Sequence, residues 1–214
     1  MSVTITRISQ TKKGRFALFA NDEFLFSVDD ETLVKYGLSE GSLLTNEELS
    51  SMKDTSDIRK AKNQALRYLS LRAYAQQELY NKLCLKYDPH TAAAAVQDMC
   101  ELDLLDDETF ALEKAKGLLQ RGKSSSEIRR QLNALGVDRT TVEWAVQAAG
   151  PNDAETAYTV LQKGGYIEKL RRGQRDKVMA ALARRGFWHG DICRAVERAQ
   201  QQLAEETSPE QEMI

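Results

Sequence analysis

The first 28 residues alternate apolar and polar side chains, which is the pattern of half-buried β-strands. The apolar positions of this period-two pattern are Val3, Ile5, Phe16, Leu18, Phe24, Phe26 and Val28. Asn21 and Asp22 lie between the last two runs, and residues of these types favour the tight turn of a β-hairpin. The sequence therefore predicts a β-rich start that contains a hairpin.

Two helix starts follow the strand-like region. The segment DDETLVKYG predicts a short helix that begins at Asp29 or Asp30 and stops at Gly37. The segment TNEELSSM opens with Thr45 and Glu48, which have the spacing of a capping box. After a polar stretch, DTSDIRKA, no strand signal remains, and the chain is expected to be helical to about residue 203.

The helical region repeats itself. The segments ELYNKLCLKYD (78–88), EIRRQLNALGV (127–137) and KVMAALARRGF (177–187) share one apolar pattern. Its columns are Leu79, Ile128 and Val178, then Leu83, Leu132 and Leu182, then Tyr87, Gly136 and Gly186. In the second and third copies, glycine is expected to end the helix in the left-handed conformation that it adopts at little cost. Further apolar helices flank each segment, so the unit is three helices used three times.

Three short helices cannot bury their apolar faces alone, so neighbouring units are expected to stack. The predicted fold is mainly α, with tandem three-helix repeats that form an elongated curved solenoid behind a small N-terminal β-rich (α+β) module. The expected parts are the module at 1–55, repeat 1 at 56–104, repeat 2 at 105–150, repeat 3 at 151–204 and an acidic tail at 205–214.

Asp106 and Asp107 are adjacent carboxylates that could form a catalytic pair or begin a helix. They fall at the start of repeat 2, where carboxylates cap free amides and favour the helix N-terminus. A catalytic pair needs a pocket and a partner that separates the two pKa values, and no histidine, metal set or glycine-rich loop lies near. We interpret both as capping residues. Ser124 and Glu127 likewise have capping-box spacing.

The other residues that could take part in catalysis, phosphate binding or metal binding give only weak signals. His90 and His189 are isolated and fit no metal or triad spacing. Segment 163–166, KGGY, lacks the residues of a phosphate loop, and we interpret it as a linker between helices. The three cysteines, Cys84, Cys100 and Cys193, are widely spaced, which argues against disulfides and a metal knuckle. We expect no enzymatic activity, metal or cofactor. Without an apolar run of membrane-spanning length or a signal peptide, the expected location is the cytoplasm.

The formal net charge of −2 hides an uneven distribution. Residues 156–203 hold ten Lys and Arg against four Asp and Glu, whereas the tail adds Glu205, Glu206, Glu210 and Glu212. Basic residues recur near the second helices of repeats 2 and 3, where stacking would line them along one groove. This candidate basic face comprises Arg121, Lys123, Arg129, Arg130, Arg171, Arg172, Arg175, Lys177, Arg184 and Arg185. Such a face suits nucleic acid, or a protein that holds nucleic acid.

Several of these motifs, in this order and spacing, resemble the RecX family of bacterial recombination regulators. The resemblance rests on the tandem three-helix units, the junction LLDDETFALEKA (104–115), the EIRRQLNALGV segment and the closing LARRGF (182–187), and it covers roughly residues 60–200. The β-rich module resembles the extension of a longer subset of that family. Tyr87, Asp103 and Ser124 depart from the family pattern, which more often has glycine at the first and third places and a small residue at the second.

We expect the chain to be a monomer, and the resemblance implies a non-enzymatic modulator that lies in the groove of the RecA filament on single-stranded DNA. There it would hinder strand exchange, ATP turnover and cleavage of the SOS repressor, with direct contact to single-stranded DNA as a secondary interaction and no membrane partner. The alternative is a stand-alone nucleic-acid-binding helical repeat protein, although the slightly acidic chain is unlike most dedicated binders. A third possibility is a scaffold whose β-rich module contacts the partner.

Overall fold

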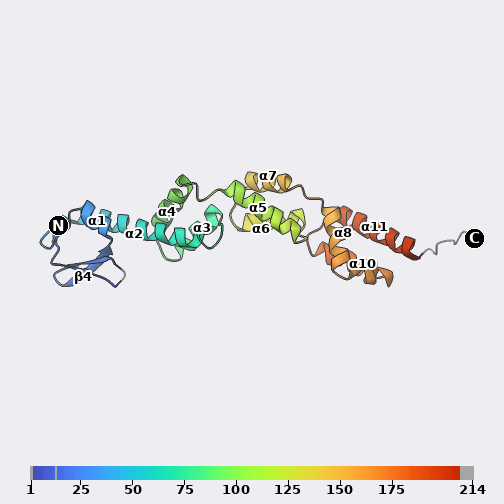
Figure 1. Ribbon diagram of the computed structural model, residues 1–214, viewed down its shortest axis with the longest axis horizontal. Coiled ribbons are helices and arrows are strands. Elements are labelled where there is room, and N and C mark those ends of the chain that lie inside the picture. Colours follow the sequence, from blue (N-terminus) through green and yellow to red (C-terminus); the bar gives the residue numbers. More distant parts are fainter. Residues whose placement is uncertain (1, 13, 208–214) are drawn as a thin grey trace, which may run out of the picture. The chain divides into compact units, whose positions relative to one another are not determined.

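The computed structural model describes residues 2–12 and 14–207, which contain five strands and eleven helices (Figure 1). The chain divides into two compact units. The first holds the residues up to 74 together with 78–105, and the second holds residues 75–77 together with the chain from 106 onward. The prediction of a mainly helical chain with a small β-rich module is confirmed. The elongated curved solenoid stays a prediction.

The β-rich module contains two small antiparallel sheets. Strands β2 (Arg7–Gln10), β3 (Phe16–Ala20) and β4 (Glu23–Val28) pair in sequence order. Strands β1 (Ser2–Thr4) and β5 (Leu43–Thr45) form a separate pair that closes the module. We did not predict β5, because three residues between two helix signals are too short for a period-two pattern to emerge.

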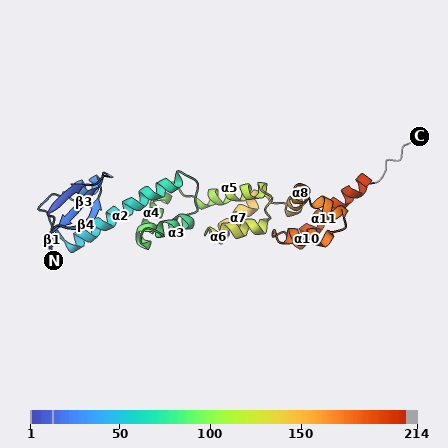
Figure 2. The same cartoon turned by 90° about the horizontal axis from the view of Figure 1, so that it is seen from below.

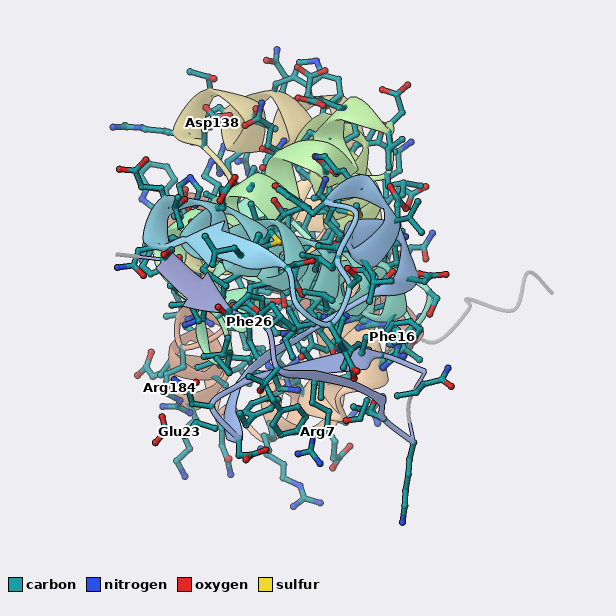
Figure 3. The ribbon with its side chains drawn as sticks, turned by 90° about the vertical axis from the view of Figure 1, so that its left-hand side faces the viewer. Arg7, Phe16, Glu23, Phe26, Asp138 and Arg184 are labelled. Carbon is teal, nitrogen blue, oxygen red and sulfur yellow. The ribbon has the colours of Figure 1, made fainter. Side chains whose placement is uncertain are left out.

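The predicted hairpin between β3 and β4 is confirmed. Asn21 and Asp22 have φ angles of +50° and +63°, as a two-residue turn with both central residues left-handed requires. Leu18 is fully buried, and its neighbour on β4, Phe26, packs on the same core. Strand β4 lies beside the start of α2 (Asn46–Leu69) (Figure 2). Arg7 lies on the outer side of the module, with its guanidinium carbon 4.1 Å from the centre of the Phe19 ring (Figure 3).

Both predicted helix starts in the module are confirmed. Asp29 caps α1 (Asp30–Lys35), and Gly37 follows that helix with a φ of +56°. Thr45 and Glu48 form a complete capping box at the start of α2. This long helix continues to Leu69, so the boundary predicted after residue 55 falls inside it. The polar stretch 54–61 is helical because Ser56 and Ala61 lie on its buried face.

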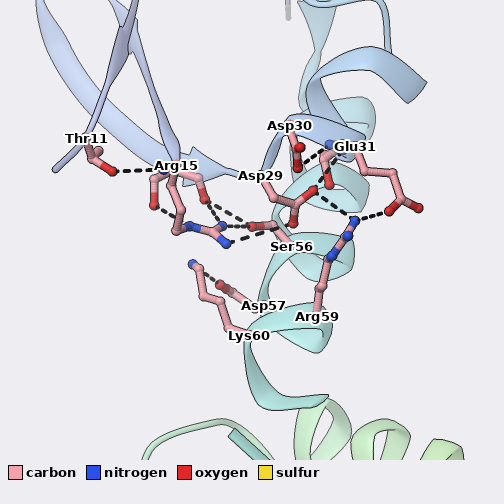
Figure 4. Close-up of polar contacts among 11 residues, drawn as sticks. Thr11, Arg15, Asp29, Asp30, Glu31, Ser56, Asp57, Arg59 and Lys60 are labelled. Carbon is pink, nitrogen blue, oxygen red and sulfur yellow. Dashed lines mark hydrogen bonds and ion pairs between the residues drawn. The ribbon is translucent and has the colours of Figure 1, made fainter. Parts of the chain in front are cut away.

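Arg15 fastens the β-rich module to α2 (Figure 4). Its Nη2 atom donates to the carbonyl oxygen of Ser27 at 2.6 Å and to Oγ of Ser56 at 2.5 Å. Asp29 lies in the same cluster, 3.2 Å from Nη1 of Arg59. Burial opposes ionisation of Asp29, but hydrogen bonds from Thr32 and the two nearby arginines keep its carboxyl pKa below the ordinary value. The start of α2 therefore belongs with the module, and its second half belongs with repeat 1.

Repeat 1 packs the second half of α2 against α3 (Gln76–Cys84) and α4 (Pro89–Glu101). Repeat 2 consists of α5 (Asp107–Gln120), α6 (Ser125–Ala134) and α7 (Arg139–Ala149). The residues of the two predicted apolar columns are fully buried in all three repeats. They are Leu79, Leu83, Ile128, Leu132, Val178 and Leu182. Each repeat has its own hydrophobic core.

Repeat 3 departs from the predicted three helices. It contains α8 (Asp153–Lys163), α9 (Tyr166–Arg171), α10 (Arg175–Ala183) and α11 (His189–Thr207). The KGGY segment, predicted as a linker, separates α8 from an extra helix, α9. Gly165, whose backbone is left-handed, directly precedes this helix. The last helix runs to Thr207, so the predicted acidic tail begins within it. Glu210 and Glu212 lie outside the described residues.

Replacing Leu132 with Asp should unfold repeat 2, since an unpaired charge in a buried position costs roughly 3–5 kcal/mol. Asn133→Asp is the matched control, because Asn133 is exposed on the same helix. Circular dichroism during thermal unfolding should show lost helicity and a lower Tm for Leu132→Asp alone. Equal melting of the two variants would show that the register of α6 is wrong.

Candidate functional site

Asp106 and Asp107 serve two different helices and do not form a catalytic pair. Asp106 caps α5, accepting from the backbone nitrogen of Glu108 at 2.9 Å, and hydrogen bonds from Thr109 and Glu108 lower its carboxyl pKa. Asp107 instead accepts from the backbone nitrogen of Gln76, the first residue of α3, at 2.8 Å. Burial raises the pKa of the Asp107 carboxyl, against the effect of that hydrogen bond. The predicted capping role is confirmed, but Asp107 caps a helix 31 residues away.

The same arrangement recurs 46 residues later. Asn152 caps α8 by accepting from Glu155 nitrogen at 3.1 Å. Asp153 reaches back to Ser125, the first residue of α6, and accepts from its backbone nitrogen at 2.9 Å and its hydroxyl at 2.5 Å. We did not single out Asp153 from the sequence. Aligning DDET (106–109) with NDAE (152–155) would have found it, since both place Asp directly after an N-cap residue.

Glycine completes each of these contacts. Gly136 follows α6 with a φ of +82°, and a Cβ there would lie 2.4 Å from Cβ of Gln77. Gly186 follows α10 with a φ of +84°, and a Cβ there would lie 2.9 Å from Oγ of Ser124. We call this pairing of a reaching aspartate with a close glycine the repeat joint. It needs glycine both for its left-handed backbone and for its lack of a side chain.

The second repeat joint holds the turn after α10 against the start of α6. The hydroxyl of Ser124 donates to the carbonyl oxygen of Arg185 at 3.2 Å and accepts from the backbone nitrogen of Glu127. The predicted capping box is therefore half correct: Ser124 caps α6, but the Glu127 side chain binds Arg130 and Gln131. Because Ser124 is tied to Arg185, side chains from both repeats meet here.

Five of the ten predicted basic residues line one cleft at this place, with a volume of about 560 Å³. The side chains that line it are Arg121, Lys123, Glu127, Arg130, Arg184 and Arg185. It therefore has five cationic groups against one carboxylate. We call it the basic cleft.

The carboxylate of the basic cleft is already engaged. Arg130 donates to Glu127 from Nε and Nη2, each at 2.7 Å, and Gln131 donates at 2.7 Å. These hydrogen bonds lower the pKa of Glu127 to about 2, so it stays ionised at neutral pH. Within the described part of the chain, no carboxylate forms an ion pair with the four remaining cations, Arg121, Lys123, Arg184 and Arg185. A concave site with such an excess of positive charge attracts anions.

The other five predicted residues do not line this cleft. Arg129 pairs with Glu143 at 2.9 Å, Arg172 pairs with Glu168 at 3.0 Å, and Arg171 pairs with both Glu168 and Glu206. Arg175 and Lys177 are exposed on the first turn of α10, the end of that helix opposite to Arg184. The predicted single face is therefore divided into a cleft and a set of scattered cations.

Comparison with known proteins places the chain in a family. Residues 3–45 match the model of the regulatory protein RecX N-terminal domain, and residues 61–99 match that of the first RecX three-helix domain. A regulatory protein RecX of Lactobacillus delbrueckii subsp. bulgaricus is 32% identical over 218 residues, which cover 97% of this chain and 78% of the relative. The chain belongs to the RecX family. The RecX of Bacillus subtilis is 28% identical, with 96% of this chain and 81% of the relative covered.

Solved RecX structures share the fold. One crystal structure of regulatory protein RecX has a TM-score of 0.66 at 21% identity, covering 88% of this chain and 96% of that chain. RecX from Lactobacillus salivarius has a TM-score of 0.60 at 23% identity, covering 69% and 99%. The resemblance drawn from the sequence motifs is thus confirmed at the level of family and fold. None of the helices described is long and apolar enough to cross a bilayer.

Removing the carboxylate of Asp153 should loosen the second repeat joint. Asp153→Ala leaves the Ser125 nitrogen and hydroxyl without their acceptor, and loss of a helix cap costs about 1–2 kcal/mol. Urea unfolding of the full chain measures this loss. Glu113→Ala, an exposed change in α5, should alter the free energy of unfolding by less than about 0.5 kcal/mol. If the two variants were equally stable, Asp153 would have no role in the joint.

Proposed function

We propose that this chain binds the groove of the RecA filament on single-stranded DNA and inhibits its recombinase, ATPase and co-protease activities. The observation that supports this most is the basic cleft, where four cations that form no ion pair with a described carboxylate face solvent beside a fixed turn. Membership of a family of regulatory proteins supports the same class of function. In this proposal the chain acts as a cytoplasmic monomer, as a regulator with no reaction or cofactor of its own.

The charge of the cleft suits a nucleoprotein partner. Cations that face phosphates or acidic side chains supply affinity without reading a base sequence, as binding along a filament of any sequence requires. Electrostatic complementarity also speeds the encounter of the two partners. Because Ser124 and Asp153 tie the two walls of the cleft together, the backbone that carries its cations is fixed before the partner arrives. Less conformational entropy is then lost on binding.

Reversing two charges of the cleft tests the proposal. We expect the wild-type chain to lower the rate of DNA-dependent ATP hydrolysis by RecA as its concentration rises. Arg184→Glu with Arg185→Glu should abolish most of that inhibition, because two attractions become two repulsions. The matched control is Arg175→Glu with Lys177→Glu, which makes the same charge change on α10 outside the cleft and should keep the inhibition.

Two outcomes would contradict this assignment. If the wild-type chain fails to slow ATP hydrolysis at every ratio to RecA, the inhibitory function is wrong. If both double variants lose inhibition equally while their circular dichroism spectra match the parent, the cleft has no special role among the basic residues. Equal helicity matters here, because an unfolded variant would lose activity for another reason.

The basic cleft also favours the alternative of a stand-alone nucleic-acid-binding protein, so the two must be separated. A salt titration of DNA binding without RecA does this, since phosphate contacts weaken steeply as salt rises. Our proposal predicts weak binding to free DNA at physiological salt and firm co-sedimentation with the RecA filament. Tight binding to free DNA that equals binding to the filament would favour the alternative.

A further inference from the structure

The residue just before α11 breaks a pattern that the first two repeats keep. Asp88, Asp138 and Trp188 occupy equivalent positions, each 50 residues after the last. Asp88 caps α4, accepting from Thr91 nitrogen at 3.0 Å, and Asp138 caps α7, accepting from Thr140 nitrogen at 2.7 Å. Trp188 has no side-chain acceptor for this role. The last helix of repeat 3 therefore receives no side-chain cap from this position, unlike its counterparts in the first two repeats.

Trp188 is also unusually open for its size. It is 76% exposed, so its ring contributes little to the core of repeat 3. A Cβ at Gly190 would lie 3.3 Å from two ring atoms of Trp188, which places the ring directly over the first turn of α11. Glycine within a helix is itself unfavourable. An aromatic residue thus stands where the first two repeats have a capping residue, and a glycine lies beneath its ring. Both residues lower the stability of the fold, and the ring stays exposed to solvent.

Residues that lower the stability of a fold without a compensating contact are expected at functional sites. An exposed indole can contact another protein or stack on a nucleobase. Its position favours the second use, since Trp188 lies three residues after Arg185, and their Cα atoms are at most about 11 Å apart. A positively charged groove beside an aromatic side chain is the combination that binds single-stranded nucleic acid. A duplex fits less well, because its bases are stacked on one another.

We propose that Trp188 stacks on an unpaired nucleobase while the basic cleft holds the neighbouring phosphates. The second and third repeats thereby bind single-stranded nucleic acid directly. This inference deepens the proposed function, since the strand is then the DNA of the filament. The cations supply charge attraction, and the indole supplies a contact that only an unstacked base can make. Modest affinity for free strands at low salt is consistent with firm binding to the filament.

Intrinsic fluorescence tests the contact without RecA, so its outcome is independent of the ATPase experiment. Trp144, the other tryptophan, lies on α7, and Trp144→Phe makes Trp188 the sole reporter. Oligothymidylate added at low salt should quench its emission, and added salt should restore it. Inorganic polyphosphate, which has charge but no base, should leave the emission largely unchanged. The reciprocal variant Trp188→Phe, which reports from Trp144, should show little response.

Trp188→Ser separates a binding role from a structural one. Serine supplies the missing cap without adding charge, so the Tm should stay equal or rise, while affinity for oligothymidylate should fall about tenfold, the loss expected for one stacked base. Trp188→Tyr, which keeps an aromatic ring, should retain most of the affinity.

Three results would overturn the inference. The first is unchanged oligothymidylate affinity in Trp188→Ser, and the second is equal quenching by polyphosphate and oligothymidylate. The third is a Trp188→Ser variant that loses RecA inhibition but still binds the oligonucleotide, which would assign the indole to a protein contact. If RecA were not inhibited while Trp188 was still quenched by the single strand, the proposed function would fail and this binding site would stand.

Discussion

The repeat joint is the contact that holds repeat 3 against repeat 2 within the second unit. A three-helix unit buries its own leucine columns, yet the first turn of its second helix still has backbone N–H groups without partners. Asp107 and Asp153 satisfy such groups from the next repeat, and Gly136 and Gly186 let the backbones approach closely. The joint needs both residue types. The aspartate fixes the orientation of the neighbouring helix start, and the glycine lets the two backbones come into contact.

The joint also explains how a cationic cleft arises between two repeats. By fixing the turn at Arg185 to Ser124, it gathers cations from two repeats that their own helices would separate. The basic cleft is thus a product of stacking, whereas Arg129 and Arg172 are neutralised by carboxylates within their own repeats. Repeat 3 differs further at Trp188, where a cap has been replaced by an exposed ring. The repeated features form the scaffold. The positions where repeat 3 departs from the repeated pattern lie on the surface that we propose binds the partner.

The sequence predicted features that depend on local geometry. Ile128 and Leu132 were placed in the core because helical periodicity alone decides the buried face, and Thr45 with Glu48 marks a helix start through a contact three residues apart. The hydrogen bond from the Gln76 nitrogen to Asp107 could not be predicted in this way, since the two residues lie on separate helices. Arg129 and Arg130 are neighbours in sequence, yet about 100° of rotation per residue turns one toward Glu143 and leaves the other in the cleft. Helix α9 was missed because a left-handed Gly165 looks like any linker glycine.

Lysine footprinting of the full chain, free and bound to the RecA filament on single-stranded DNA, tests the central claim most directly. Lys123 lines the basic cleft, and Lys177 is exposed outside it, so one experiment contains its own control. Acylation followed by mass spectrometry should show Lys123 protected in the complex and Lys177 as reactive as in the free chain. Protection of Lys177 with Lys123 unchanged would contradict the account.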